Sequence, residues 1–166
     1  MRMRTGHALY AVAVALAALF MATPAQAACD PLALCTCTVS ASGLSFGNYN
    51  PVASGDNDSS GTVRVRCSLV VALGGSYTIQ LSKGTSSTYA PRVLTSGGST
   101  LAYNLYTSNA RNQVWGDGTG GSQTVTSNFI ALLSLDQTTT VYGRIPAGQN
   151  VPPGSYSDTV LVTVIF

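Results

Sequence analysis

Apolar and polar positions alternate along much of this chain, and the pattern is clearest at its C-terminal end. In an extended strand, alternate side chains point to opposite faces. One face of the stretch 156–166 would carry the apolar residues Val160, Val162, Val164 and Phe166. The opposite face would carry Leu161, Thr163 and Ile165. Because both faces are largely apolar, we expect this strand to be covered on both sides. No further strand follows, so we expect one edge of its sheet to stay open.

Shorter alternating segments recur throughout the chain, separated by turns rich in Gly, Ser and Pro. In the clearest of them Val63 and Val65 alternate with Arg64 and Arg66, which is typical of a half-buried strand. The predicted strands are residues 36–40, 44–49, 62–67, 77–81, 92–95, 101–107, 123–126, 138–145 and 156–166. Turns are expected at 74–75 and 97–98, and residues 129–135 fit a strand or a short helical turn. This pattern predicts an all-β fold, a β-sandwich of antiparallel sheets.

The first residues have the pattern of an export signal. Arg2 and Arg4 form a positive start, an apolar run over residues 8–21 follows, and Ala25-Gln26-Ala27 is a small-x-small cleavage site. The apolar run is short for a membrane span. We therefore expect residues 1–27 to be removed, which leaves a mature chain from residue 28 that is long enough for one domain.

Charged side chains are sparse, at 8% of the sequence. Loss of Arg2 and Arg4 with the signal would leave six basic residues and six acidic ones, all aspartate, so the mature chain is formally neutral. Neutrality without a basic cluster argues against nucleic acid or an anionic membrane as a partner. Abundant Gly, Ser, Thr and Val fits an exported all-β domain.

All four cysteines lie in the predicted mature chain. An even number in an exported protein indicates disulfides, and four cysteines allow three pairings. A Cys35–Cys37 bridge is the least favoured, because one intervening residue forces a strained geometry. We favour Cys37–Cys67, which would join the first two strands, with Cys29–Cys35 closing a small loop.

The predicted mature chain lacks the side chains that most enzymes use. It contains no glutamate, and the single histidine, His7, lies in the signal. This composition excludes Ser-His-Asp and Cys-His arrangements and histidine-based zinc sites. We therefore expect a protein that is not an enzyme, with no catalytic residue, metal site or cofactor.

Two aspartate-bearing stretches resemble sites at first sight. Asp117 lies in a Gly-rich segment, residues 115–121, where turn chemistry explains its presence. Residues 56–58 read Asp-Asn-Asp but lack the glycine and closing glutamate of a calcium loop. We interpret both as loops, the second as a solvated loop tip.

Several segments resemble the spore coat protein U domain family, and in order they span nearly the whole predicted mature chain. They are CTVSASGLSFGNY at 37–49, GTVRVRC at 61–67, LYT at 105–107, VWGDGTG at 114–120, VYGRIPAGQ at 141–149 and PGSYSDTV at 153–160. The resemblance implies a subunit of archaic chaperone–usher pili. Its residues 37–166 would form an incomplete immunoglobulin-like antiparallel β-sandwich that lacks the final strand.

The resemblance also implies partners and a mode of assembly. A periplasmic pilus chaperone would lend the missing strand, and an outer-membrane usher would exchange it for the N-terminal extension of a neighbouring subunit. We expect the acceptor groove to be lined by the first face of the last strand, Val160, Val162, Val164 and Phe166. Leu161 and Ile165 are the substitutes if the other face lines it. The donor residues would be Leu32 and Leu34 in the short extension, residues 28–36.

The short extension affects the expected place of the subunit in a fibre. Pro31 and a Cys29–Cys35 loop are awkward for a long donor strand. The sequence therefore favours a minor or tip-proximal subunit of a cell-surface pilus, exported through the periplasm. The alternative is a tip adhesin that binds a surface or a glycan, because a tip subunit needs a groove but no donor.

Overall fold

The half-buried strand around Val63 lies at the centre of the larger sheet. The computed structural model describes residues 25–28, 35–69, 73–131 and 133–166, and in it this strand is β3 (Asn57–Leu69). Val63 and Val65 are buried, whereas Arg64 and Arg66 both donate hydrogen bonds to the Asp136 carboxylate of the neighbouring strand, over 2.6–3.2 Å. The alternation of apolar and charged residues therefore sets the two faces of β3.

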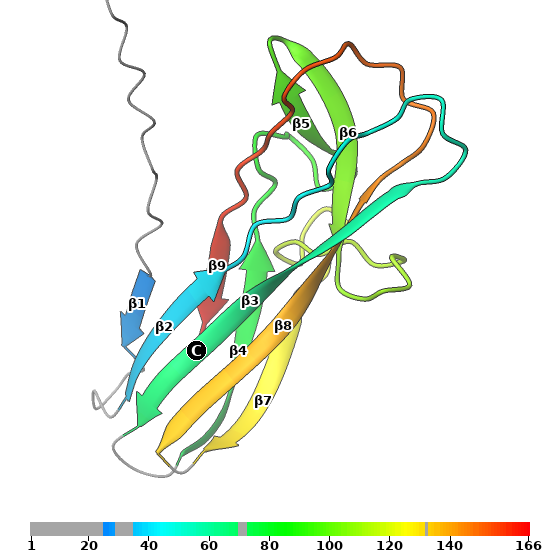
Figure 1. Ribbon diagram of the computed structural model, residues 1–166. Coiled ribbons are helices and arrows are strands. Elements are labelled where there is room, and N and C mark those ends of the chain that lie inside the picture. The colour runs from blue at the N-terminus through cyan, green and yellow to red at the C-terminus, as the bar shows by residue number, and fades with distance from the viewer. Residues whose placement is uncertain (1–24, 29–34, 70–72, 132) are drawn as a thin grey trace, which may run out of the picture.

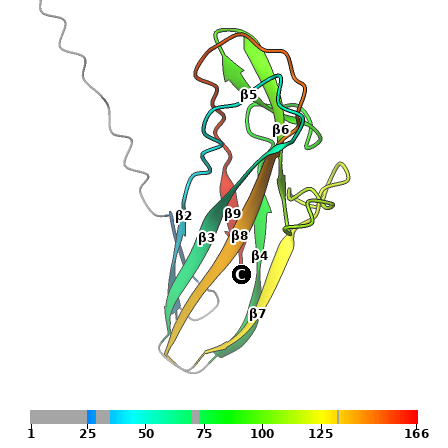
Figure 2. The same cartoon turned by 45° about the vertical axis from the view of Figure 1, so that its right-hand side comes forward.

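The described elements are all strands, arranged in two antiparallel sheets that pack face to face (Figures 1 and 2). The larger sheet has the order β1 (Ala25–Ala28), β2 (Cys35–Ala41), β3, β8 (Ser134–Ile145), β6 (Ser99–Tyr106) and β5 (Arg92–Ser96). The smaller sheet has the order β7 (Val125–Ala131), β4 (Leu73–Leu81) and β9 (Val162–Ile165). The predicted all-β antiparallel fold is confirmed.

The core lies between the two sheets and is built from the alternate apolar positions of their strands. Its buried side chains include Val63, Val65, Tyr77, Ile79, Leu81, Leu101, Tyr103, Leu105, Trp115, Leu135, Val141 and Ile145. Polar atoms of the buried aromatic residues have partners, because the Tyr77 hydroxyl donates to Gln137 Oε1 at 2.6 Å and Trp115 Nε1 donates to the Ile79 carbonyl at 3.1 Å. Burial of these rings is therefore compatible with their polar groups.

A disulfide joins β2 and β3 at directly opposite positions. Cys37 pairs with Cys67 in the ladder, their Cα atoms are 4.0 Å apart, and both side chains are buried. This is the longer of the two bridges that the sequence favoured. The predicted Cys29–Cys35 bridge lies outside the described residues, because Cys29 and the side chain of Cys35 are not described.

Three local predictions are wrong. Residues 44–49 are not a strand, since after β2 the chain leaves the ladder and crosses the inner face of the larger sheet. Gly74 and Gly75 form no turn but lie in β4, opposite Ile130 and Phe129 of β7. The last strand is also shorter than predicted, because only residues 162–165 join β4 in a regular ladder.

Candidate functional site

The last strand, β9, has one open edge. Among the described strands it pairs with β4 alone. The Ser82 amide donates to the Leu161 carbonyl at 2.9 Å, so the alternation of an antiparallel ladder turns the backbone groups of Leu161, Thr163 and Ile165 toward β4. The N–H and C=O groups of the residues between them, Val160, Val162 and Val164, then face the open edge. A strand edge of this kind is a template for pairing with another strand.

The same three valines point their side chains inward. Val160, Val162 and Val164 are partly buried and pack against the core. Leu161 and Ile165 lie on the outer face of the smaller sheet and are 67% and 50% exposed. The sequence left open which face of the last strand borders the groove, and the structure turns the valine face toward the inside of the sandwich.

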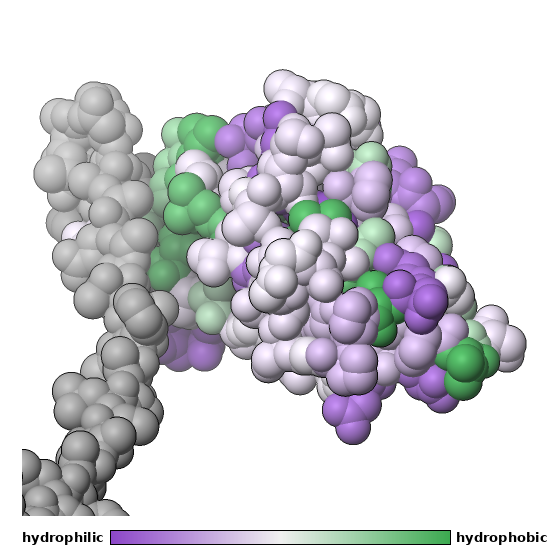
Figure 3. Space-filling model, turned by 90° about the horizontal axis from the view of Figure 1, so that it is seen from above, coloured by the Kyte–Doolittle hydropathy of each residue, from purple (hydrophilic) through white to green (hydrophobic). Residues whose placement is uncertain are grey.

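An apolar groove lies beside this open edge. It encloses a cavity of about 820 Å³. Its floor is the inner face of the larger sheet with Leu81 of the smaller one, its two walls are residues 41–49 and 151–162, and Leu94 contributes from β5. Seen from above the view of Figure 1, apolar residues gather mainly along one side of the molecule, whereas most of the remaining surface is weakly polar (Figure 3). The cavity lining is mainly apolar, which fits the side chains of a peptide better than a compact polar ligand.

The four acceptor residues expected from the sequence do not all line this cavity. Val160 and Val162 do. Val164 lies farther along β9 and packs against the core. Phe166 is 38% exposed and lies against Tyr77, with ring centroids 5.8 Å apart. The expected donor residues, Leu32 and Leu34, lie outside the described part of the chain.

Sequence reasoning missed how the opposite wall is built. Leu44 and Phe46 lie over two glycines of the larger sheet, Gly61 and Gly143, where a Cβ atom would come within 3.0 Å of the Leu44 or Phe46 side chain. Phe46 also meets Tyr103 of the floor edge to face, with centroids 6.0 Å apart. The alternation Leu44-x-Phe46 was visible in the sequence, but it does not reveal that both side chains pack on glycines from another segment.

Two polar side chains, Tyr103 and Asp158, also line the groove and were not anticipated. Asp158 accepts a hydrogen bond from the Tyr103 hydroxyl at 2.7 Å. Burial raises the pKa of Tyr103, and the adjacent Asp158 carboxylate raises it further. The phenol is therefore a hydrogen-bond donor at neutral pH, and Tyr103 and Asp158 form a satisfied polar pair within a lining that is mainly apolar.

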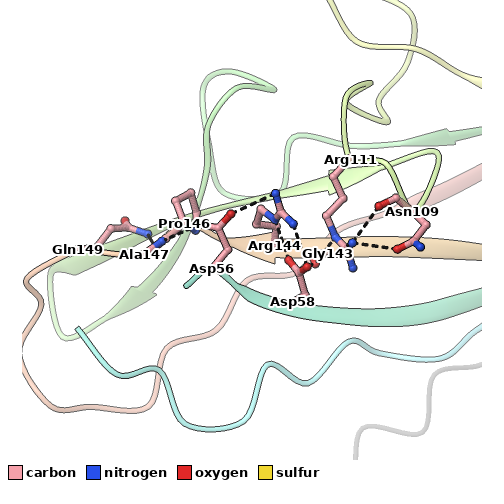
Figure 4. Close-up of polar contacts among 9 residues, drawn as sticks. All are labelled: Asp56, Asp58, Asn109, Arg111, Gly143, Arg144, Pro146, Ala147 and Gln149. Atoms are coloured by element: carbon pink, nitrogen blue, oxygen red, sulfur yellow. Dashed lines mark hydrogen bonds and ion pairs between the residues drawn. The ribbon is translucent and has the colours of Figure 1, made fainter. Parts of the chain in front are cut away.

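The Asp-Asn-Asp stretch forms an ion-pair cluster, so its interpretation as a solvated loop tip is wrong. Arg144 lies between Asp56 and Asp58, at 3.1 Å and 2.7 Å, and Arg111 reaches Asp58 at 3.3 Å (Figure 4). The Ala147 amide also donates to Asp56. Hydrogen bonding to Arg144 lowers the pKa of Asp58, and the charges of both arginines add to the effect. The cluster fastens the start of β3 to the end of β8.

The Gly-rich loop around Asp117 is a turn, as expected. Asp117 Oδ1 accepts hydrogen bonds from the Thr119 amide and hydroxyl at 2.9 and 2.6 Å, and these lower the pKa of Asp117 to about 2. Trp115 is fully buried. Within the described ranges, no group of three or more His, Cys, Asp or Glu side chains could hold a metal ion. Nor does any helix of the described residues have the length and hydropathy to cross a bilayer.

Three comparisons with known proteins agree with the sequence resemblance. The family model for the Spore Coat Protein U domain matches residues 23–163. Protein U of Myxococcus xanthus is 35% identical over 135 residues, which cover 74% of this chain and 71% of that protein.

A solved structure has a similar fold. It is the chaperone-tip adhesion subunit pre-assembly complex CsuC–CsuE from the archaic chaperone-usher Csu pili of Acinetobacter baumannii. The TM-score is 0.52 at 22% identity, over 80% of this chain and 40% of the matched chain. This chain therefore spans less than half the length of that structural relative. The likeness supports the predicted fold, an immunoglobulin-like antiparallel sandwich.

Proposed function

The chain belongs to the spore coat protein U domain family, and from the groove we propose that it is a structural subunit of a surface pilus or fibre. The observation that carries the proposal is the coincidence of an open backbone edge on β9 with an apolar cavity beside it. An added strand would pair with the backbone groups of Val160, Val162 and Val164. It would also remove the valine side chains from water, and both effects stabilise the complex.

The proposal includes the partners and the route. A periplasmic chaperone would fill the groove first, an outer-membrane usher would promote exchange, and a neighbouring subunit would supply the final strand at the cell surface. The structural relative, described as a chaperone-tip adhesion subunit pre-assembly complex, supports a chaperone as the first partner. Each subunit would accept a strand at one place and donate from another, so association runs head to tail and produces an open fibre.

The donor in this proposal is the short extension, residues 28–36, with Leu32 and Leu34 as the residues that enter a neighbour's groove. The two leucines are two residues apart, so in a strand both side chains would lie on the same face and could enter the groove together. The shortness of the extension supports a minor or tip-proximal position. The predicted cleavage point after Ala27 falls within β1, so a mature chain would keep only the last residue of that strand.

Export in the presence and absence of a co-produced pilus chaperone tests the acceptor role. We expect a high yield of a soluble chaperone complex in the first case, and a lower yield with partial degradation or aggregation in the second. Equal yields of soluble chain with and without the chaperone would contradict the proposal. For the donor role, Leu32→Asp with Leu34→Asp should weaken fibre assembly while chaperone capture persists. Unchanged assembly would remove the two leucines from the mechanism.

A tip adhesin is the second candidate, and exposed apolar side chains at one end of the sandwich favour it. Ile130, near the end of β7, and Leu133, in the β7–β8 connection, are 93% and 68% exposed. A tip that binds an apolar surface should lose adhesion, but not fibre assembly, when Ile130→Asp and Leu133→Asp are combined. Unchanged adhesion would exclude this role for the end of the sandwich.

A further inference from the structure

The carboxylate of Asp158 is the main polar anchor of one groove wall. Its Oδ1 accepts hydrogen bonds from the amides of Thr85 and Thr159, each at 2.8 Å, and its Oδ2 accepts from the Tyr103 hydroxyl at 2.7 Å. Three donors on one carboxylate leave little of its hydrogen-bonding capacity to water. The anchor thus joins the wall to the loop before β5 and to the floor strand β6.

Few other hydrogen bonds hold residues 158–160 of this wall. Before them Ser157 pairs with Thr95 of β5, and after them Leu161 forms hydrogen bonds with Ser82. Within the described part of the chain, the hydrogen bonds that tie residues 158–160 to other segments all end on the Asp158 carboxylate. Val160, which lines the groove, therefore lies between two attachments, the Asp158 carboxylate on one side and the Leu161–Ser82 hydrogen bonds on the other.

The facing loop is shaped for this carboxylate. Gly84 has φ of +67°, a conformation that residues with a side chain rarely adopt, and a Cβ atom there would collide with Asp158. Ser82 Oγ accepts a hydrogen bond from the Gly84 amide and another from the Leu161 amide. The loop and the wall are thus held together at two neighbouring points.

Tyr103 connects this wall to the opposite one. The phenol is 4% exposed on the floor of the cavity, its hydroxyl bonds to Asp158, and its ring meets Phe46 edge to face at 6.0 Å. Phe46 belongs to the wall formed by residues 41–49, and Asp158 belongs to the wall formed by residues 151–162. One side chain on the floor therefore contacts both walls.

We propose that the Tyr103–Asp158 pair sets the width of the groove, and so selects the size of the side chains that an incoming strand can insert. The inference rests on the proposed strand-accepting function. A fixed width admits one strand without a prior ordering step, which favours binding by lowering its entropic cost. Loss of the Tyr103–Asp158 bond loosens residues 158–160, which then keep, among the hydrogen bonds to other described segments, only the bond from the Thr85 amide to Asp158. The groove then binds more weakly and discriminates less between small and large side chains.

The test measures binding of two fluorescein-labelled peptides to the mature chain by anisotropy, with folding checked by circular dichroism. In one peptide leucine alternates with threonine, and in the other tryptophan replaces leucine. We expect the wild type to prefer the leucine peptide. Asp158→Ala should weaken its binding by at least about tenfold, and Tyr103→Phe, which removes only the hydroxyl, by about threefold or more. Both variants should bring the ratio of the two dissociation constants closer to one.

Asp136→Ala is the matched control, because it removes a carboxylate from the outer face of the larger sheet. It should leave the ratio of dissociation constants unchanged. An equal ratio in the wild type and in both groove variants would overturn the inference while leaving the strand-accepting function intact. If the wild type binds neither peptide, the proposed function fails and the inference fails with it. If Asp158→Ala does not fold, the ratio of dissociation constants measured for Tyr103→Phe alone tests the inference.

Discussion

A methyl group added at Gly61 tests whether residues 42–46 pack against the larger sheet. The new Cβ of Gly61→Ala would lie 2.8 Å from Leu44 Cδ1 and 2.9 Å from the Ser42 carbonyl oxygen. Leu44 can rotate, but the Ser42 backbone is held by a 2.8 Å hydrogen bond from its amide to the Thr62 carbonyl. Overpacking of this kind costs about 1–3 kcal/mol. Alanine also restricts the unfolded chain, which offsets about 0.4–1 kcal/mol. We expect a net loss of about 1–2 kcal/mol.

Urea unfolding provides the measurement, with the leucine–threonine peptide present to fill the groove. Trp115 is the single tryptophan and is fully buried, so its fluorescence reports the transition. Gly43→Ala is the matched control, since nothing lies within 4 Å of a Cβ at that position. Combining Gly61→Ala with Leu44→Ala should cost less than the sum of the single changes, because one of the two close contacts disappears. Equal stability of Gly61→Ala and Gly43→Ala would refute the packing described for this wall.

Three further predictions concern other parts of the molecule. Replacing both Cys37 and Cys67 with alanine should lower the free energy of unfolding by about 3–4 kcal/mol, measured in urea, because the bridge closes a loop with a sequence separation of 30. Asp58 has a lowered pKa in the folded chain, so its contribution is present above about pH 4 and is lost as the pH falls toward the folded value. Asp58→Asn should therefore flatten this part of the stability–pH curve, by up to about 1 kcal/mol for so exposed a group, and an unchanged curve would contradict the role of the cluster. Val162→Asp should abolish peptide binding because a carboxylate would be buried without a partner, whereas Thr163→Asp on the outer face should bind normally, and equal binding would argue against the groove.

The strands of this fold could be predicted from the sequence because their alternation reflects burial on one face. In β3 the buried valines, Val63 and Val65, mark the inner face, and the arginines between and after them mark the outer face. The same reasoning failed at residues 44–49, where alternation comes from two side chains that pack on glycines rather than from a ladder. Local pattern cannot distinguish these cases, because the glycines lie far away in the sequence.

The groove could be predicted only in part. The family resemblance suggested Val160 and Val162 as groove residues and both line the cavity, but the apolar pattern alone left open which face of the strand would do so. Phe166 continues the same alternation but lies against Tyr77, since β9 extends beyond the end of the cavity. Tyr103 and Asp158 gave no signal, because their hydrogen bond joins positions 55 residues apart. Pairings of this kind depend on the tertiary fold, which a single sequence does not reveal.

Amide hydrogen exchange along the last strand tests the strand-accepting role most directly. The mature chain is compared with and without the leucine–threonine peptide, with resolution of single residues. Addition of the peptide should protect the amides of Val160, Val162 and Val164, which face the open edge. The amides of Thr163 and Ile165, which already face β4, should change little. Uniform protection along the strand, or none, would contradict the account of an open edge that accepts another strand.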